Sequence, residues 1–368
     1  MNYRLLVLIF ILMCLGCSSP NKEKVYYNDL KQTEWQNEID NRCSTIDCSI
    51  TKWYDGKRKA IVFTWDDSSF GIDGVRKVFD QYNLKTTFFV NTAIINDKYL
   101  KFRLFYKGTL NSVIKRAIKK GHEIGSHTHD HVNLSKLRLN EVEDQYVKSS
   151  NFIFDKYGFR PSTLSHPNSC YNSKIDSLTN IYFLGSRYSV ANDLDTTIRY
   201  LHVRESYSFE YYKKNLDSFI ESDANLYVYG GHQLEGGYEP LGGGAGTLSK
   251  LLDYVVRKYQ GLCWITTLED ALMYKLIRDR ISINNEKGSV FIDMSQINDI
   301  LAKYLHPHAY LTLQFQGNLD FYSKGLVEYR YDGLNSYCTI DLRISNQLDY
   351  KPIDSSYIIQ ESMRNLKK

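Results

Sequence analysis

Between residues 58 and 278, short apolar runs alternate with segments of helical periodicity, and this alternation is the strongest constraint on the fold. An apolar run bounded by turn residues is typical of a buried strand, whereas apolar positions three and four apart indicate an amphipathic helix. The strand candidates are residues 60–65, 85–91, 123–125, 162–165, 181–188, 225–229 and 263–266. The helix candidates are residues 74–82, 110–120, 140–157 and 248–259. Repeated strand–helix units predict an α/β fold with a parallel sheet, and about seven strands favour a barrel over a short open sheet.

Past residue 278 the alternation stops. Residues 295–305 look like a capped helix, and residues 309–315, 326–331 and 338–344 alternate apolar with polar side chains. A period of two is the pattern of half-buried antiparallel strands. We therefore predict a small α+β or β-rich C-terminal region over residues 279–368, and we assign it no activity.

The N-terminus has the pattern of an export signal. Residues 1–4 carry positive charge, and residues 5–15 form an apolar run too short to span a bilayer as a helix. The run leads into Leu15-Gly16-Cys17, which resembles the lipobox of bacterial lipoproteins. An ordinary cleaved secretory signal is the alternative. We expect residues 1–17 to be a lipoprotein signal peptide with Cys17 as the lipidated residue, followed by a tether and lead-in over residues 18–57.

Cysteine usage agrees with an oxidising compartment. Two of the seven cysteines belong to the leader, and five remain. Cys43 and Cys48 lie in the sequence CSTIDC, close enough for a disulfide to close a small loop. The other three are not spaced as a thiolate metal site, and at least one of them must stay free because five is odd.

The sequence gives no sign of a nucleic-acid or a nucleotide partner. Net charge is only +4, with both signs interleaved, so there is no basic stripe that would bind nucleic acid. The glycine-rich loop at residues 235–246 lacks the strand–turn–helix pattern of a phosphate-binding loop. We therefore expect no nucleotide site.

Histidines cluster in the sequence GHEIGSHTHDH, residues 121–131. His127 and His131 are four residues apart, so in a helical turn they would share one face, while His129 would point away from it. Two neutral imidazoles on one face can provide two of the ligands of a zinc site. By itself, a hydrated surface turn explains the cluster equally well.

Two carboxylates at the end of the first strand candidate offer the further metal ligand and the base that the two histidines alone do not supply. The side chains of Asp66 and Asp67 diverge at a strand end, so they serve different roles. With Asp67, the two histidines make a two-histidine, one-carboxylate site with room for water, the ligand count of a catalytic metal. Asp66 would then take the proton of that water. Capping of the following helix by the two aspartates is the structural alternative.

A further histidine, His232, follows the strand candidate 225–229 in the sequence LYVYGGHQLEGG. A histidine at a strand end is suited to protonate a leaving amine. A structural histidine that binds a loop carbonyl is the alternative.

Five segments in order, FTWDD, KTTFFV, GHEIGSHTHDH, GGHQ and WITTLEDALMY, resemble the polysaccharide deacetylases of the NodB-homology type, carbohydrate esterase family 4. The resemblance covers residues 58–278. It implies a distorted (β/α) barrel with one divalent metal on Asp67, His127 and His131. Zinc is the first choice of metal, and cobalt, nickel and manganese are the alternatives. The same resemblance implies Asp66 as the base and His232 as the acid in hydrolysis of an N-acetyl or O-acetyl group from a sugar.

The chain departs from this family in its third and fourth motifs. The family's Arg-Pro-Pro-Tyr-Gly segment is matched by residues 158–169, and its arginine falls on Ser165 and its tyrosine on Asn168. We expect the Asn168 backbone N–H to help hold the oxyanion, Arg187 to replace the missing arginine, and His166 to line the substrate pocket. The fourth motif, with its aspartate and tryptophan, is not found.

These patterns predict a metal-dependent deacetylase that acts on an acetylated cell-envelope or extracellular polysaccharide or oligosaccharide. We expect it to be secreted across the inner membrane and lipid-anchored in the bacterial cell envelope. One alternative is a non-catalytic or weakly active carbohydrate-binding lipoprotein on the same fold. Another is hydrolysis of a non-sugar amide, against which export of the protein argues.

Overall fold

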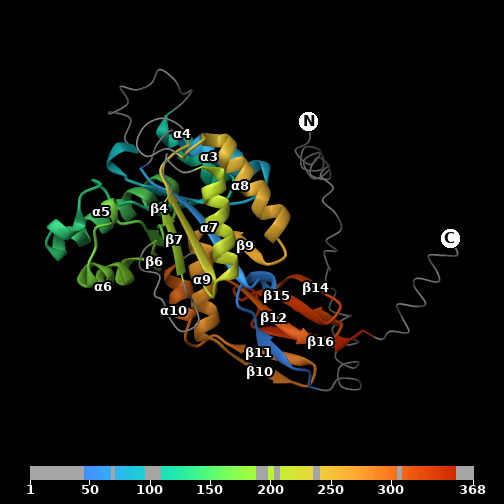
Figure 1. Ribbon diagram of the computed structural model, residues 1–368. Helices are drawn as coiled ribbons and strands as arrows, with labels where there is room; N and C mark the ends of the chain where they lie inside the picture. Colours follow the sequence, from blue (N-terminus) through green and yellow to red (C-terminus); the bar gives the residue numbers. More distant parts are fainter. Residues whose placement is uncertain are drawn as a thin grey trace, which may run out of the picture.

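The predicted strand–helix units form a parallel sheet in the structure, which is a computed structural model of the chain. It describes residues 45–67, 71–95, 109–187, 198–202, 208–234, 241–304 and 309–353. The sheet consists of β2 (Lys59–Trp65), β3 (Thr87–Val90), β4 (Glu123–Ser126), β5 (Thr163–Leu164), β6 (Gly185–Ser186), β7 (Ile198–His202), β8 (Leu226–Gly231) and β9 (Cys263–Thr266). The strand order is β6-β5-β4-β3-β2-β8-β7, with β9 paired to β2 (Figure 1). From β2 to β6, neighbours in the chain are neighbours in the sheet, and the predicted (β/α) barrel is confirmed.

The barrel is distorted at β2. Strand β8 pairs with β2 along residues 60–65. On the other edge of β2, β9 pairs with residues 59–62 and β3 with residues 64–65. One edge therefore serves two strands, which diverge from each other there.

Helices pack against the sheet on both of its faces. They are α3 (Gly71–Gln81), α4 (Leu110–Lys119), α5 (Leu139–Tyr157), α6 (Ser173–Tyr182), α7 (Phe209–Glu221), α8 (Gly244–Tyr259) and α9 (Leu268–Arg280). Alternation along β2 sends Ile61 and Phe63 into the core shared with α3, α4, α7 and α8. Ala60 and Val62 face the other way, toward Phe89 and α9. The strand is thus buried on both faces, in agreement with its largely apolar sequence.

Two details of the predicted barrel strands are wrong. The strand predicted at residues 181–188 is a helix end followed by the two-residue strand β6. The Asn172 side chain accepts hydrogen bonds from the N–H groups of Lys174 and Ile175, and this cap starts α6, which continues to Tyr182. Strand β7 has no counterpart in the prediction, because its sequence IRYLH is not an apolar run bounded by turn residues.

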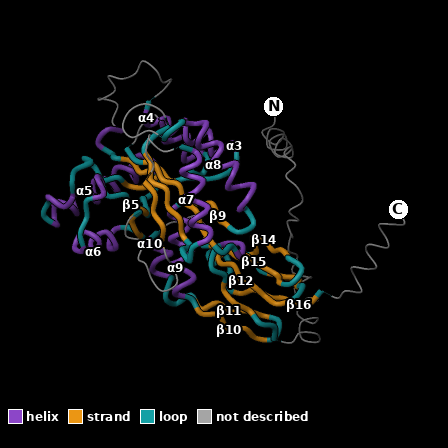
Figure 2. Tube along the Cα trace, viewed as in Figure 1, coloured by secondary structure: helices purple, strands orange, loops and turns teal. Residues whose placement is uncertain are grey.

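The C-terminal region is a sandwich of two four-stranded antiparallel sheets (Figure 2). In strand order, one sheet contains β1 (Cys48–Ile50), β12 (Tyr310–Gln316), β15 (Asn335–Asp341) and β14 (Leu326–Tyr331). The other contains β10 (Ser282–Glu286), β11 (Ser289–Asp293), β16 (Gln347–Pro352) and β13 (Leu319–Tyr322). The expected capped helix is α10 (Asn298–Lys303), which begins without a side-chain cap. Strand β1 belongs to the segment that we predicted to be a tether and lead-in, and its pairing with β12 was not anticipated.

Polar contacts join the sandwich to the barrel. The Tyr274 hydroxyl on α9 lies 2.8 Å from Thr51 Oγ1 and accepts a hydrogen bond of 3.3 Å from the Thr312 N–H. At the same junction, the Tyr54 hydroxyl donates to Glu328 and the Arg330 guanidinium binds Asp55. The lead-in therefore connects barrel and sandwich.

Several expectations concern residues outside the described part of the chain. These are the signal peptide, the lipidated Cys17, most of the tether, and Cys43 with its expected disulfide. Within the described part, Cys170, Cys263 and Cys338 are free thiols. No helix among the described residues is long and apolar enough to cross a membrane.

A fully buried carboxyl group, Glu123, connects the start of β4 to its neighbours. One carboxyl oxygen accepts hydrogen bonds from the Thr87 hydroxyl at 2.7 Å and from the Glu269 N–H at 2.9 Å, and the other oxygen contacts the Thr163 hydroxyl. Burial, and then the negative charge of Glu269, raise the pKa of Glu123 to about 8.

We expect the free energy of unfolding to fall as pH rises from 4.5 toward 8, by on the order of 5 kcal/mol. Over this range the folded state holds the Glu123 proton and the unfolded state has released it, so each rise in pH favours unfolding. Urea unfolding of the Glu123→Gln variant should show a flatter dependence on pH than the wild type. An equal slope in both proteins would contradict the assignment.

Candidate active site

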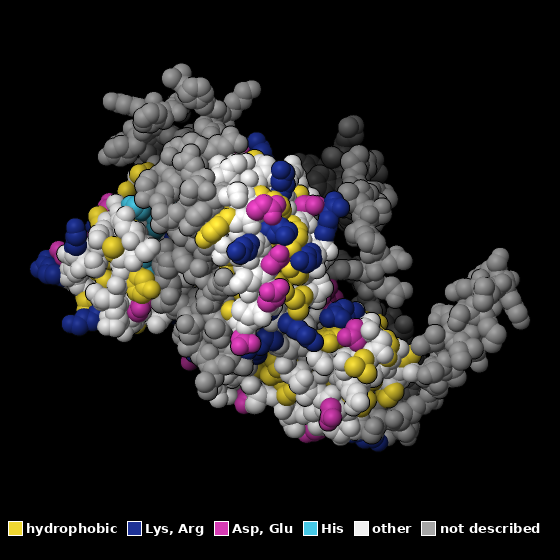
Figure 3. Space-filling view, in the orientation of Figure 1, with side chains coloured by type: hydrophobic (Ala, Val, Ile, Leu, Met, Phe, Trp, Pro, Cys, Tyr) yellow, Lys and Arg dark blue, Asp and Glu magenta, His cyan; other side chains and the backbone are white. Residues whose placement is uncertain are grey.

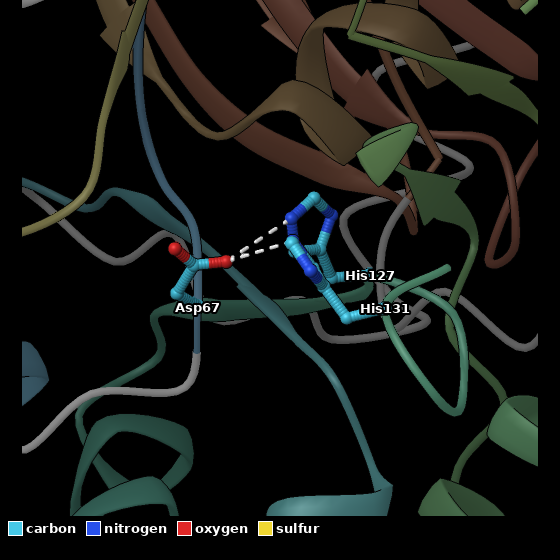
Figure 4. A group of neighbouring side chains, drawn as sticks. All are labelled: Asp67, His127 and His131. Carbon is cyan, nitrogen blue, oxygen red and sulfur yellow. Dashed lines mark ion pairs between the residues drawn. The ribbon is translucent and has the colours of Figure 1, made fainter. Parts of the chain in front are cut away.

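Three side chains from distant parts of the barrel converge at one point: Asp67, His127 and His131 (Figure 4). Their ligand atoms all lie within 4.8 Å of one another. The Nε2 atoms of His131 and His127 lie 3.1 and 3.4 Å from Asp67 Oδ1. Two ligands of a tetrahedral zinc ion lie roughly 3.3–3.5 Å apart, given metal–ligand bonds of about 2.0–2.2 Å. The spacing therefore suits ligands that share one metal ion.

The parallel sheet and the turn after β4 bring these side chains together. Asp67 follows β2 and His127 follows β4, and the two strands flank β3 with their carboxyl ends at the same edge of the sheet. We predicted that the two histidines share one face of a helical turn, and this is wrong, because residues 127–131 form no helix. Gln145 of α5 shapes this turn instead, by accepting from the N–H of Asp130 at 2.9 Å and donating to its carboxylate at 2.8 Å.

Left-handed backbone conformations concentrate around the site. Asp67, Thr128, His131, Asn168 and Ser169 have φ angles between 54° and 74°. Such angles are unfavourable for residues with a side chain and persist only where the surrounding structure holds them. The chain therefore accepts local strain where it places these side chains.

The chemistry of the three donors fits a cation. The His127 Nδ1 donates a hydrogen bond of 2.7 Å to the Ser165 carbonyl, so in the neutral ring the lone pair of Nε2 faces Asp67 Oδ1. That oxygen is buried and has no hydrogen-bond partner of good geometry. Although burial alone would raise it, the pKa of Asp67 is held well below its usual range by His127 and His131. A carboxylate oxygen and two imidazole nitrogens are ligands for zinc, and cobalt, nickel and manganese accept the same set.

Asp66 lies beside this centre and is held by Arg187. The Arg187 Nη1 and Nη2 atoms donate to the two carboxylate oxygens at 2.8 and 2.6 Å. Both side chains are buried, and Asp66 Oδ2 lies 3.9 Å from His127 Nε2. Arg187, which follows β6, is thus paired with Asp66, and its expected role as the replacement for the family arginine stays a prediction.

A close contact at Gly125 makes room for this pair. The Arg187 guanidinium lies 5.8 Å from the centre of the Phe89 ring. Any Cβ at Gly125 would lie 2.6 Å from that ring, closer than atoms approach without overlap. The glycine of the GHEIG segment therefore permits the packing that supports Arg187.

His232 approaches the centre from the other side of Asp67. Its Nε2 lies 3.7 Å from Asp67 Oδ2, whereas the two other histidines face Oδ1. The side chain is 12% exposed, at the end of β8. This position suits a group that exchanges protons with a substrate at the centre.

The sequence model of the polysaccharide deacetylase family matches residues 54–183. These residues form a polysaccharide deacetylase domain. All three converging side chains, together with Asp66, lie inside the matched range, whereas Arg187 and His232 lie beyond it.

Two proteins to which this chain is similar in sequence are named as deacetylases. The peptidoglycan-N-acetylglucosamine deacetylase PgdA of Listeria monocytogenes is 28% identical over 161 residues, which are 44% of this chain and 31% of that protein. The chitin deacetylase of Arthroderma benhamiae is 31% identical over 119 residues, 31% of this chain and 29% of that protein. The chain thus spans about a third of the length of these relatives. A family 4 acetyl xylan esterase from Clostridium thermocellum covers 58% of this chain and 90% of its own, at 17% identity and a TM-score of 0.43.

Residues 158–169, in which the chain departs from the family's third motif, hold one correction. His166 was predicted to line the substrate pocket, but its side chain has no exposed surface. Its Nε2 lies 3.2 Å from the Thr179 hydroxyl, its ring stacks on Tyr171, and burial lowers its pKa to about 3. The helix α6 therefore encloses this ring, and we withdraw the role.

Asn168, from the same segment of the deacetylase domain, is exposed in the turn formed by residues 167–169. Its predicted contact with an oxyanion stays a prediction. Sequence reasoning missed Gln145, which lies in the predicted helix 140–157 and has no motif of its own. Only its hydrogen bonds to the turn after β4 reveal its role.

Proposed function

We propose that this chain is a metal-dependent hydrolase that removes N-acetyl or O-acetyl groups from a cell-envelope or extracellular polysaccharide. The observation that carries the proposal is the convergence of Asp67, His127 and His131 beside the Asp66–Arg187 pair. Membership of residues 54–183 in the polysaccharide deacetylase family supports the reaction class. Relatives named for peptidoglycan and chitin support an acetylated glycan as substrate.

The three converging side chains would hold the metal ion. At this centre a divalent ion would supply Lewis acidity, which polarises a carbonyl oxygen and acidifies a water molecule. The His127 hydrogen bond to the Ser165 carbonyl keeps the ring in the tautomer that binds through Nε2. Zinc suits the two nitrogens and one oxygen, and cobalt, nickel or manganese would also be accepted.

Asp66 is the general base in this proposal. It takes a proton from the attacking water at the centre, and a positioned base of this kind contributes about 10²–10⁴-fold to a rate. Arg187 pairs with both oxygens of the buried carboxylate and fixes their direction. The base is thus oriented before a substrate arrives.

His232 is the general acid. It lies across Asp67 from His127 and His131, so a substrate carbonyl at the centre would have the base on one side and the acid on the other. The imidazole gives its proton to the departing amine, or to the alkoxide of an O-acetyl ester. The proton removed from water and the proton given to the leaving group balance over one turnover.

The Asp66→Asn variant tests the proposal. We expect acetate release from acetylated chitin, peptidoglycan fragments or acetylated xylan to fall about 10²–10⁴-fold while zinc content stays unchanged. Acetate can be measured by a coupled assay on zinc-loaded protein. Equal rates in the two proteins would rule out Asp66 as the base. Saturable glycan binding without acetate release by the wild type would instead support the non-catalytic alternative.

We also propose export and anchoring of the protein through a lipid on Cys17. The proposal is supported by the short charged start, the apolar run and the lipobox-like Leu15-Gly16-Cys17. A membrane anchor in the envelope would hold the enzyme beside its polymeric substrate.

A further inference from the structure

A cavity of about 730 Å³ lies between the barrel and α10, at the amino ends of β4 and β5. The proposed active site is at the carboxyl ends of the same strands. The two sites therefore lie on opposite sides of the sheet edge, separated by at least the length of β4, roughly 13 Å for four residues at about 3.3 Å each. The cavity volume is in the range of a site for an organic ligand of several rings.

The outer wall of the cavity consists of hydrophobic side chains that remain in contact with solvent. Phe154 of α5 is 44% exposed, Val147 of the same helix 36%, and Ile181 of α6 61%. Hydrophobic side chains of this size grouped around a hollow mark a binding surface more often than chance exposure does. Figure 3 shows hydrophobic and basic side chains gathered over α5 and α6.

Polar side chains line the same cavity as these hydrophobic ones. The Arg160 guanidinium lies 5.0 Å from the centre of the Phe154 ring and donates to Asn151 Oδ1 at 2.9 Å. A guanidinium carries more donors than this bond uses. The inner wall contributes the carboxyl groups of Glu269 and Asp270. An aromatic face thus stands beside planar donors and acceptors.

This lining excludes several classes of ligand. An acyl chain would bring no polar group to the charged side chains of this lining, which include Arg160, Glu269 and Asp270. The lining carries both signs of charge, Arg160 and Lys303 as well as Glu269 and Asp270, so it matches neither a strongly anionic polymer nor a simple cation. A neutral ligand with apolar ring faces and many hydroxyl groups satisfies every part of the lining: its faces stack on Phe154, and its hydroxyls pair with the amide, the guanidinium and the carboxylates.

We propose that this cavity is a second glycan-binding site, which holds a stretch of neutral polysaccharide away from the catalytic centre. The identity of the polymer rests on the proposed function, but binding at this cavity does not depend on turnover. A polymer held at a second site raises the local concentration of its other acetylated units at the first. The site would thus favour long chains over short ones.

Binding measured in an Asp66→Asn background separates this inference from the proposed activity. The probe is chitopentaose, an uncharged pentamer of N-acetylglucosamine, titrated by calorimetry. We expect the added Phe154→Ala change to weaken binding about tenfold, because it removes the stacking face. The matched control is Leu139→Ala: Leu139 is on the same helix, is 45% exposed, and is not part of the cavity wall.

The outcomes are distinct. Weaker binding in Phe154→Ala with unchanged binding in Leu139→Ala supports the second site, whether or not the wild type releases acetate. Equal binding in both variants places the sugar elsewhere and overturns the inference. It is also overturned if the pentamer does not bind at all, or if only an extended peptide binds and Phe154→Ala abolishes that binding. Both changed side chains are exposed, so neither variant is expected to unfold.

Discussion

The His127→Ala variant is expected to bind no stoichiometric zinc and to lose acetate release by more than about 100-fold. His127 supplies one of the three protein ligands that converge in the described part of the chain. Even the loss of a group that merely orients a ligand lowers metal affinity or activity about 10–100-fold. The ligand is buried, and its ring is held by the hydrogen bond to the Ser165 carbonyl. Metal content after dialysis against zinc, measured by atomic emission, gives the stoichiometry.

His129→Ala is the matched control. His129 lies two residues away in the same turn, but its Nδ1 is 2.7 Å from the Thr92 hydroxyl and it is not among the converging ligands. This variant should keep its zinc and most of its activity. Zinc should also raise the melting temperature of the wild type and of His129→Ala, since a ligand bound only by the folded state stabilises it, and should leave that of His127→Ala unchanged. Equal zinc content in all three proteins would exclude the proposed centre.

The Arg187→Met variant is expected to lower the free energy of unfolding by about 3–5 kcal/mol. Asp66 and Arg187 are both buried, and removal of the guanidinium leaves a carboxylate that is shielded from water and has lost two charge-assisted hydrogen bonds. Activity should fall as well, because the base loses the group that orients it. Urea unfolding and acetate release measure the two effects separately.

A double variant separates stability from catalysis. Asp66→Asn combined with Arg187→Met removes both charges, and such a replacement of a buried ion pair is often close to neutral for stability. We therefore expect the double variant to recover most of the lost free energy while acetate release stays at the level of Asp66→Asn. If Arg187→Met alone is as stable as the wild type, the pair is not the buried ion pair that the structure describes.

Much of the barrel could be predicted because local patterns report burial directly. The run Ala60–Trp65 is apolar except for Thr64, and the structure buries this strand on both faces. Asp66 and Asp67 follow it immediately, so their place at the carboxyl edge of the sheet was set by the chain itself. His127 follows β4 for the same reason. In both cases the distance along the chain between strand and functional residue is one or two positions.

The features of the fold and the site that the sequence did not predict depended on contacts between segments far apart in the chain. Arg187 meets Asp66 across 121 positions, and β1 meets β12 across more than 250. His166 lies inside a matched motif, yet α6 buries it, since its surroundings are set by the helix cap at Asn172 and not by the motif. Which distant segments pair depends on the surfaces that become buried against each other, and the local periodicity of the sequence does not report this.

By itself, the sequence determined the parallel sheet, the three candidate metal ligands and the carboxylate beside them, because alternation and strand ends are local properties. Only the tertiary structure decided that a turn held by Gln145, and not a helical face, brings His131 to Asp67. It also decided that Arg187 pairs with Asp66 and that the lead-in becomes a strand of the C-terminal sandwich. These choices are made by burial and charge pairing between distant segments, which exist only once the chain has folded.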